Sequence, residues 1–506
     1  MGLVRNLWGQ AGRNPGLIAL ADSAGRSVSY AHLALAVGLG GGLLRDAGIR
    51  PGDRVLVCLP NGFDFVQAYY SVIAAKAIAV PVSPRLPPAD VERVLSDCRP
   101  LAAITAPGAQ VPGPRISLTP ADLAYDATDD EGAGQAAARA RGAMTLLEEA
   151  AANIEDGPAV ILYTSGTTGD PKGAMLAGEA LAANAEAMGE ASASGPEDAH
   201  LCTLPLHHSF GATVSMNMPI ATGGRIVFGG QFIPAGVARL IRRARVRVWA
   251  GVPAMFAAMA ERADVDPGDL GSLRMCISGG AALPRPVFRA FSERFGIEIS
   301  EGYGLTEASP VVTATRAGDR VISGAVGPPI PGVCVRIVDE SGEEMARGQA
   351  GEVCVSGPGM MLGYYRRPRD TSQVLSDGWL RTGDVGLVDE HGYLRILDRQ
   401  RDVINTSGYK VYPVEVEETI RQHPAVDDAL VVGQPHRVRG EVVVAHVQLR
   451  PEARGTSERE LLLFCRRRLA SYKAPACVII HEALPVNEMG KPSRQLVRAQ
   501  GEITEQ

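Results

Sequence analysis

The sequence lacks the features that would place it among secreted, zinc-binding or membrane-spanning proteins. Its eight cysteines include no CxxC pair, and most of them lie in apolar, strand-like runs. This pattern argues against a disulfide framework and a zinc site, and it predicts small buried thiols in a reducing compartment. The first ten residues contain no apolar signal core, and no apolar run is long enough to span a bilayer. We therefore expect a cytoplasmic protein with no transmembrane segment.

An excess of charge of one sign is also missing. The chain carries 50 Lys and Arg residues against 56 Asp and Glu residues, a net charge of −6, so nothing in the bulk charge favours nucleic acid. The Arg-rich stretch 241–249 alternates with apolar residues, and we interpret it as a solvated helix face that leads into a strand. With 506 residues and 46% hydrophobic content, two or more globular domains are expected.

Two common nucleotide-binding fingerprints are absent as well. The glycine-rich stretch GLGGGL (38–43) has leucine where the dinucleotide fingerprint needs its third glycine. In YTSGTTGDPKG (163–173), Pro171 replaces the second glycine of a Walker A loop. A strand that leads into glycines and hydroxyl side chains still predicts a loop that wraps phosphates, with Lys172 as a mobile positive charge. The alternative for this stretch is a tight turn without a ligand.

Alternating strands and helices in the first half predict parallel sheets with helices on both faces. The expected strands are 54–60, 77–84, 101–106, 159–164, 224–230, 246–253 and 273–280, and the expected helices include 63–77 and 234–244. Residues 107–157 are expected to form a loop and one exposed helix. From about residue 320, short strands separated by turns predict antiparallel hairpins in a small barrel-like subdomain.

After the charged segment 398–402, the pattern predicts a compact α+β domain with helix, strands and helix. We therefore expect an α/β fold with a large N-terminal domain of αβ-layered sheets at 1–397, a hinge at 398–402 and a smaller mobile domain at 403–506.

Five motifs occur in a fixed order along the chain. They are YTSGTTGDPKG (163–173), YGLTE (303–307), RTGD (381–384), DRQRDVINTSGYKVYPVEVE (398–417) and PVNEMGKPSR (485–494). This set resembles the adenylate-forming superfamily of acyl- and aryl-CoA synthetases, peptide-synthetase adenylation domains and luciferases, over residues of about 15 to 496. The resemblance implies activation of a carboxylic acid by ATP to an acyl-adenylate with release of pyrophosphate, and then transfer to a thiol. Because the first step joins two anions, positioning, a metal and cations should carry the catalysis.

The resemblance also implies roles for single residues. Lys491 matches the lysine that bridges the carboxylate and the phosphate oxygens, and Glu307 matches the glutamate that binds Mg²⁺, a hard cation that prefers oxygen ligands. Thr306 would hydrogen-bond the α-phosphate. Asp384 would accept the ribose hydroxyls, and Arg399 would reach the ribose and phosphate.

The rest of the implied ATP and AMP site comprises Thr164, Ser165, Gly166, Thr167, Thr168, Gly169, Lys172, Gly280, Ala281, Glu301, Gly302, Tyr303 and Gly304. Tyr303 would stack on adenine, with Gly280 and Ala281 on the opposite side of the slot. Taken singly, each of these residues is more simply interpreted as core or surface. Their order together indicates the function.

The stretch PLHHSFG (205–211) resembles the family's PLFHxxG motif and places His208 near the reacting carboxylate. The implied acid pocket comprises His207, His208, Phe210, Gly211, Val214 and Gly302. Either histidine could instead be a buried, hydrogen-bonded residue. The helix that follows is apolar and free of charge, and the glycines are interpreted as keeping space open, which favours a medium- to long-chain fatty acid. An aryl acid such as a benzoate or cinnamate is the alternative.

For the second half-reaction, Arg401 occupies the family's hinge position, and the thiol tunnel would comprise Gly408, Tyr409 and Lys410. A Cβ at Gly408 would obstruct such a tunnel. Coenzyme A is the expected acceptor, and the alternative is a ligase that loads an acyl, aryl or β-amino acid onto the phosphopantetheine thiol of a carrier protein. A non-catalytic binding paralogue is a third hypothesis, against which Lys491 and Glu307 argue. The expected cofactors are ATP, Mg²⁺ and CoA, with no nucleic-acid partner; the sequence predicts no oligomeric state.

Overall fold

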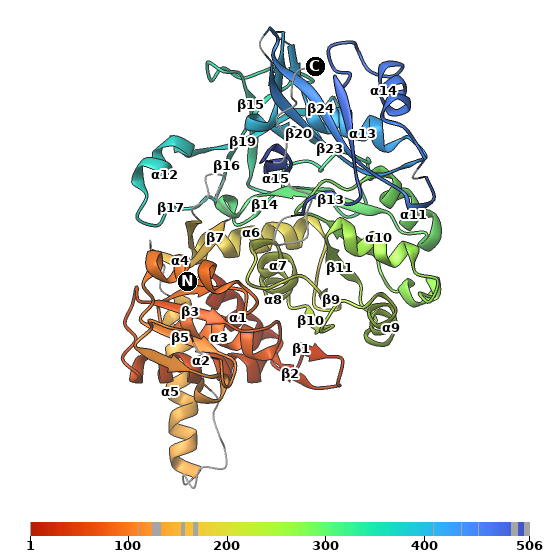
Figure 1. Ribbon diagram of the computed structural model, residues 1–506. Coiled ribbons are helices and arrows are strands. Elements are labelled where there is room, and N and C mark those ends of the chain that lie inside the picture. Colours follow the sequence, from red (N-terminus) through yellow and green to blue (C-terminus); the bar gives the residue numbers. More distant parts are fainter. Residues whose placement is uncertain are drawn as a thin grey trace. The chain divides into compact units, whose positions relative to one another are not determined.

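The computed structural model in Figure 1 describes residues 2–109, 111–123, 133–152, 157–164, 171–407, 409–436, 438–453, 455–486 and 494–499. The chain divides into two compact units. The first unit contains Met1–Val335, Cys354–Arg381 and Gly392–Leu394, and the second contains Arg336–Val353, Thr382–His391 and Arg395–Gln506. The second unit thus includes two stretches that precede residue 398, and the hinge at 398–402 stays a prediction.

A seven-stranded sheet in the first unit has the order β17-β8-β7-β4-β3-β5-β6. Its strands are β3 (Arg54–Cys58), β4 (Ile78–Pro81), β5 (Ala102–Thr105), β6 (Ile116–Leu118), β7 (Pro158–Thr164), β8 (Lys172–Ala177) and β17 (Gly363–Tyr364). Strands β3 to β7 are parallel, whereas β8 and β17 are antiparallel additions at one edge. The parallel strands are continuous apolar runs because helices cover both of their faces.

An eight-stranded sheet in the same unit has the order β14-β13-β12-β11-β9-β10-β1-β2. Its strands are β1 (Ile18–Asp22), β2 (Ser27–Ser29), β9 (Ala199–Cys202), β10 (Arg225–Phe228), β11 (Val248–Gly251), β12 (Met275–Ser278), β13 (Ile299–Gly304) and β14 (Val311–Ala314). The inner strands are parallel, and the outer strands β2 and β14 are antiparallel to their neighbours.

Helices pack around these two sheets. They are α1 (Gly2–Arg13), α2 (Tyr30–Asp46), α3 (Phe63–Ala74), α4 (Pro88–Cys98), α5 (Ala133–Ala152), α6 (Gly178–Ala191), α7 (Ser209–Ala212), α8 (Met218–Thr222), α9 (Pro234–Ala244), α10 (Pro253–Glu261), α11 (Arg285–Phe295) and α12 (Pro368–Val374). Shorter helical turns are η1 (Pro120–Leu123), the π-helix η2 (Thr213–Asn217), η3 (Pro267–Leu270) and η4 (Thr306–Ala308). Helix α5 packs against α2 and extends beyond it in Figure 1.

The interpretation of the Arg-rich stretch 241–249 as a helix face that leads into a strand is confirmed. The stretch begins in the last turn of α9, whose apolar residues are buried, and it runs into β11. Arg242 and Arg247 form ion pairs with Asp269 and Asp198. Within the described residues, no helix has the length and apolar character needed to cross a membrane.

The short strands expected after residue 320 form a five-stranded sheet of order β15-β16-β19-β18, with β20 beside β19. They are β15 (Cys334–Val338), β16 (Gly351–Ser356), β18 (Leu375–Ser376), β19 (Trp379–Val388) and β20 (Leu394–Arg399). Along the chain, four of the five boundaries between the two units fall within β15, β16, β19 and β20, and the fifth lies between β19 and β20.

The second unit contains a further sheet of order β22-β21-β24-β23, with β25 beside β24. Its elements are η5 (Gln400–Asp402), β21 (Ile404–Thr406), β22 (Tyr409–Val411), α13 (Pro413–Arg421), β23 (Val426–His436), β24 (Gly440–Leu449), η6 (Pro451–Ala453), α14 (Glu458–Arg466), β25 (Cys477–His481) and α15 (Arg494–Ala499). Side chains alternate along β24, so Val443 and Val447 pack with α13 and α14, whereas Val442 and Val444 pack with Val497 of α15. The predicted α/β fold class is confirmed.

Candidate active site

Parallel strands bring the YGLTE motif, the PLHHSFG motif and the predicted adenine-slot residues Gly280 and Ala281 to one edge of the eight-stranded sheet. Strand β12 ends at Ser278, directly before Gly279 and Gly280, and its neighbour β13 ends at Gly304 in the YGLTE motif. Strand β9 lies in the same sheet and leads into the PLHHSFG motif. Because parallel strands end at the same edge, these motifs lie where ligands bind in open α/β sheets.

The YGLTE motif forms a tight reversal between β13 and β14. Tyr303 pairs with Thr313 across the antiparallel strands, and a Cβ added to Gly304 would overlap the carbonyl oxygen of Pro310. Only glycine allows this close approach. Thr306 and Glu307 then follow in the 3₁₀ turn η4.

Glu307 is oriented by a residue that the sequence analysis missed. The hydroxyl of Tyr364 donates a hydrogen bond of 2.7 Å to Glu307 Oε1, and the amide of Met361 donates to the Glu307 carbonyl oxygen at 2.8 Å. Tyr364 is only 8% exposed because it belongs to β17, which pairs with β8. In the sequence, Tyr364 lies in the short run MLGYYRR (361–367). Its hydrogen-bond partner Glu307 is 57 residues away, so the local pattern could not predict this contact.

The carboxylate of Glu307 fits a magnesium ion. Mg²⁺ is commonly held by one or two carboxylates together with substrate phosphates and water. Among the described residues there is no cluster of three or more His, Cys, Asp or Glu side chains that would bind a metal without a substrate. An oriented single carboxylate therefore suits a metal shared with nucleotide phosphates.

Lys172 contacts the same tyrosine that hydrogen-bonds Glu307. Its Nζ lies 5.3 Å from the centre of the Tyr364 ring and 3.5 Å from Asp370 Oδ1. Thr164 is the last residue of β7, and Lys172 is the first residue of the antiparallel strand β8. The Thr164 hydroxyl donates a hydrogen bond to the Lys172 carbonyl oxygen at 3.3 Å. The predicted phosphate-binding residues Ser165, Gly166, Thr167, Thr168 and Gly169 lie outside the described residues.

The two motif histidines differ in environment. His208 is exposed and caps α7, where its Nδ1 accepts a hydrogen bond from the Phe210 amide at 3.3 Å, so a neutral ring carries its proton on Nε2. Burial, together with the charge of His208, lowers the pKa of His207 to about 4. His207 is therefore neutral near pH 7. The hydroxyl of Ser209 lies 3.1 Å from that of Thr306 and links this motif to YGLTE.

Two of the predicted acid-pocket residues, Val214 and Phe210, lie in or against a packed apolar cluster. Val214 is buried in this cluster and Phe210 packs against it; an added Cβ at Gly279 would lie 2.8 Å from the Phe210 ring. The interpretation that Gly211 leaves space for a substrate is wrong. A Cβ there would overlap the carbonyl oxygen of Pro205, so the glycine allows the chain to approach its own backbone.

The helical stretch after Gly211 is free of charge as expected, but it is not uniformly apolar. It buries three polar side chains, Thr213, Ser215 and Asn217. Thr213 donates to the Ser309 carbonyl at 3.0 Å, and Asn217 Oδ1 accepts from the Tyr70 hydroxyl at 3.0 Å.

The glycine-rich slot after β12 is held by Glu301. Its carboxylate accepts backbone hydrogen bonds from Leu283 at 3.2 Å and Gly324 at 3.0 Å, and it is 6% exposed. Gly280 has φ of +78°, a conformation that favours glycine. Glu301 therefore shapes the loop that contains Gly280 and Ala281, while its predicted contact with a nucleotide remains a prediction. Gly302 pairs with Ala314 beside this slot.

In the second unit, the two predicted ribose residues lie together. Arg399 Nε lies 2.6 Å from Asp384 Oδ1, and Asp384 is 4% exposed. Arg401 lies in the turn η5. The predicted catalytic Lys491 and the tunnel residue Gly408 lie outside the described residues.

The remaining predicted tunnel residues are at the surface of the second unit. Tyr409 is 56% exposed and its ring stacks on Tyr472 with 4.6 Å between ring centres. Lys410 Nζ lies 2.7 Å from Glu340 Oε1. Their role at a thiol tunnel stays a prediction.

Comparison with known proteins identifies the family. The family described as AMP-binding enzyme matches residues 7–365, and the AMP-binding enzyme C-terminal domain matches residues 415–491. A long-chain-fatty-acid–CoA ligase of Bacillus subtilis is 34% identical over 480 residues, covering 88% of this chain and 85% of the relative. A feruloyl-CoA synthase of an Amycolatopsis species is 33% identical and covers 94% of each.

Among solved structures, ATP-bound MatB from Rhodopseudomonas palustris superposes with a TM-score of 0.85 at 30% identity, with 98% of each chain covered. The motif order, the sheet edge that gathers the motifs and these full-length similarities agree. The chain therefore belongs to the AMP-binding enzyme family of adenylate-forming acyl-CoA synthetases.

Proposed function

We propose that this protein is an acid–thiol ligase that activates a carboxylic acid with ATP and transfers the acyl group to coenzyme A. The observation that carries this proposal is the match, over 88% and 94% of the chain, to two relatives named as CoA-forming enzymes. The site adds residues suited to such a reaction: the Glu307 carboxylate oriented by Tyr364, the Thr306 hydroxyl next to it in the chain, and Lys172 beside the Tyr364 ring.

In the first half-reaction, a carboxylate oxygen of the acid bonds to the α-phosphorus of ATP as the bond to pyrophosphate breaks. We assign the Thr306 hydroxyl to the α-phosphate and Glu307 to Mg²⁺, which when bound offsets the phosphate charge. Lys172 would steer the leaving pyrophosphate, and Lys491 would offset the charge of both reactants. No general base is required because the acid is already ionised near pH 7.

In the second half-reaction, the thiol sulfur bonds to the acyl carbon, and AMP leaves with the electrons of the broken carbon–oxygen bond of the acyl-phosphate anhydride. The thiol proton is released to water in this step. We assign Asp384 and Arg399 to the ribose; their ion pair holds the arginine beside the carboxylate. Gly408, Tyr409 and Lys410 are proposed to border the path of the thiol.

We favour a fatty acid as substrate. The stretch 212–222 after the PLHHSFG motif contains no charged residue that would pair with a charged substituent, and Val214 and Phe210 belong to or pack against an apolar cluster. An aryl acid is the second candidate, supported by the similarity to the feruloyl-CoA synthase. We also propose a cytoplasmic location, because none of the eight cysteines, all within the described residues, forms a disulfide.

Acid-dependent exchange of pyrophosphate into ATP tests the first half-reaction. Purified protein would be assayed with a long-chain fatty acid, ferulate and an amino acid, and then CoA and a holo-carrier protein would be compared as acceptors. We expect exchange with the fatty acid and faster consumption of CoA. Absence of exchange with every carboxylate would instead favour a non-catalytic binding protein.

The Lys491→Ala variant tests the assigned lysine. It should abolish exchange and leave thioester formation from a supplied acyl-adenylate largely intact, because only the first step brings two anions together. Equal loss of both half-reactions would refute this role.

A further inference from the structure

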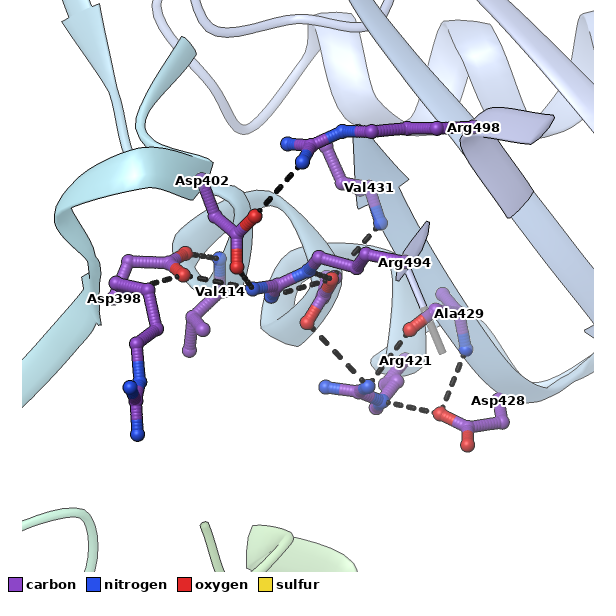
Figure 2. Close-up of polar contacts among 11 residues, drawn as sticks. Asp398, Asp402, Val414, Arg421, Asp428, Ala429, Val431, Arg494 and Arg498 are labelled. Atoms are coloured by element: carbon purple, nitrogen blue, oxygen red, sulfur yellow. Dashed lines mark hydrogen bonds and ion pairs between the residues drawn. The ribbon is translucent and has the colours of Figure 1, made fainter. Parts of the chain in front are cut away.

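A largely buried group of charges, with only Arg498 exposed, joins three segments of the second unit. This Arg494 cluster consists of Asp398, Asp402, Glu417, Arg494 and Arg498. The Arg494 guanidinium lies 2.7 Å from Asp398 Oδ1, 2.8 Å from Glu417 Oε1 and 3.5 Å from Asp402 Oδ2. Arg498 lies 3.0 Å from the other oxygen of Asp402. Figure 2 shows Asp398 and Asp402 around the end of the Arg494 side chain.

Burial of the central ion pairs restricts the orientation of the Arg494 guanidinium relative to its carboxylate partners. The side chains of Asp398, Glu417 and Arg494 are 1%, 4% and 16% exposed. Burial alone would lower the pKa of Arg494, but the charges of Glu417 and Asp398 outweigh it and raise this pKa, so the guanidinium stays charged. Burying ions is costly unless each is paired in good geometry, and the planar fork of arginine meets carboxylates in few orientations.

The carboxylates are themselves fixed to the backbone. Asp398 accepts hydrogen bonds from the amides of Arg399 at 2.8 Å and Val414 at 3.0 Å, at the entrance to α13. Glu417, on α13, accepts from the amide of Val431 on β23 at 2.8 Å. Arg494 therefore connects α15 to the predicted hinge segment, to α13 and, through α13, to the sheet.

Helix α15 depends on such contacts because it spans only Arg494–Ala499. A helix of this length is not stable by its own hydrogen bonds. Besides the ion pairs of Arg494 and Arg498, the apolar contact of Val497 holds it on the sheet. The cluster and Val497 thus fix the position of α15 within the second unit.

We propose that Arg494 is a positioning residue for Lys491, which lies three residues before it. Three residues span at most about 11 Å, so the anchor at Arg494 limits where Lys491 can reach. The same guanidinium contacts Asp398 and Asp402, so the residue that anchors the chain after Lys491 also contacts the predicted hinge segment 398–402. This inference rests on the proposed function of Lys491 in adenylation.

The test compares two arginines of the same unit. Arg494→Met removes the fork, Arg494→Lys keeps the charge, and Arg421→Met is the matched control. Arg421 contacts Glu417 at 3.6 Å, Asp428 at 2.8 Å and the Ala429 carbonyl oxygen at 2.7 Å, so it bridges α13 and β23 (Figure 2). Each variant would be assayed for pyrophosphate exchange, for thioester formation from the acyl-adenylate of the best acid plus CoA, and for melting temperature.

We expect Arg494→Met to lower exchange about 100-fold, the loss that a misplacement of about 1 Å produces, while thioester formation changes by less than about threefold. Arg494→Lys should restore part of the exchange. Arg421→Met should lower the melting temperature and change both half-reactions by the same factor.

Equal loss of both half-reactions in Arg494→Met, with a melting temperature like that of Arg421→Met, would overturn the proposal, since the cluster would then only stabilise the unit. If Arg494→Met does not fold, the ratio of the two half-reactions in Arg494→Lys decides in the same way: a selective loss of exchange supports the proposal, and an unchanged ratio overturns it. Failure of the proposed function is distinguishable, because the unmodified protein would then show no exchange with any acid.

Discussion

Replacing Tyr364 by phenylalanine tests whether the orientation of Glu307 matters for metal binding. The substitution removes a 2.7 Å hydrogen bond to Oε1 and keeps the ring beside Lys172. A hydrogen bond to a charged group contributes about 1.5 to 3 kcal/mol. Because the Glu307 side chain is only half-buried and water can partly replace the lost donor, we take the lower value, about 1.5 kcal/mol. This corresponds to about a tenfold weaker affinity.

The assay is a Mg²⁺ titration of pyrophosphate exchange, together with direct Mn²⁺ binding measured by electron paramagnetic resonance in the presence of a non-hydrolysable ATP analogue. We expect the half-saturating metal concentration to rise about tenfold in both measurements, in the range found for residues that orient metal ligands. The rate at saturating Mg²⁺ should recover to within a few-fold.

Tyr365→Phe is the matched control, because this neighbouring ring contacts Arg366 at 5.2 Å. It should leave the metal dependence unchanged. An unchanged Mg²⁺ titration and unchanged Mn²⁺ binding in Tyr364→Phe would refute the reasoning that the tyrosine orients a metal ligand.

Two further predictions concern stability. Gly211→Ala should lower the free energy of unfolding by about 1 to 3 kcal/mol, because the added Cβ overlaps the Pro205 carbonyl, whereas Gly142→Ala on the exposed face of α5 should raise it by about 0.5 to 1 kcal/mol. Calorimetry checks both, and an unchanged melting temperature in Gly211→Ala would contradict the close approach. Burial, with the charge of His481 2.8 Å away, lowers the pKa of His446 to about 4. Since the unfolded chain binds this proton more tightly, the stability of the second unit is complete above about pH 6.5 and should fall by up to about 3 kcal/mol towards pH 4. Urea unfolding of His446→Leu should lack this part of the pH dependence.

Much of the fold could be predicted because its signals are local. The apolar run 159–164 and the helical spacing in 234–244 correspond closely to β7 (Pro158–Thr164) and α9 (Pro234–Ala244). Periods of two and 3.6 residues are properties of neighbouring residues along the chain. The units were harder to predict, since Arg336–Val353 and Thr382–His391 belong with residues after 395 through contacts that no local pattern encodes.

The candidate site, like the fold, has features that local sequence predicts and features that depend on distant contacts. The sequence by itself determined the motifs, their order and the residue types suited to phosphate and acid chemistry, because these depend on adjacent residues such as Thr306 and Glu307. Only the tertiary structure decided which side chains contact and orient these residues. The hydroxyl of Tyr364 reaches Glu307 across 57 residues, and Arg494 reaches Asp398 across 96. Such pairs arise where sheet edges and packed helices bring distant segments together, and that choice of neighbour is made by packing over the whole unit.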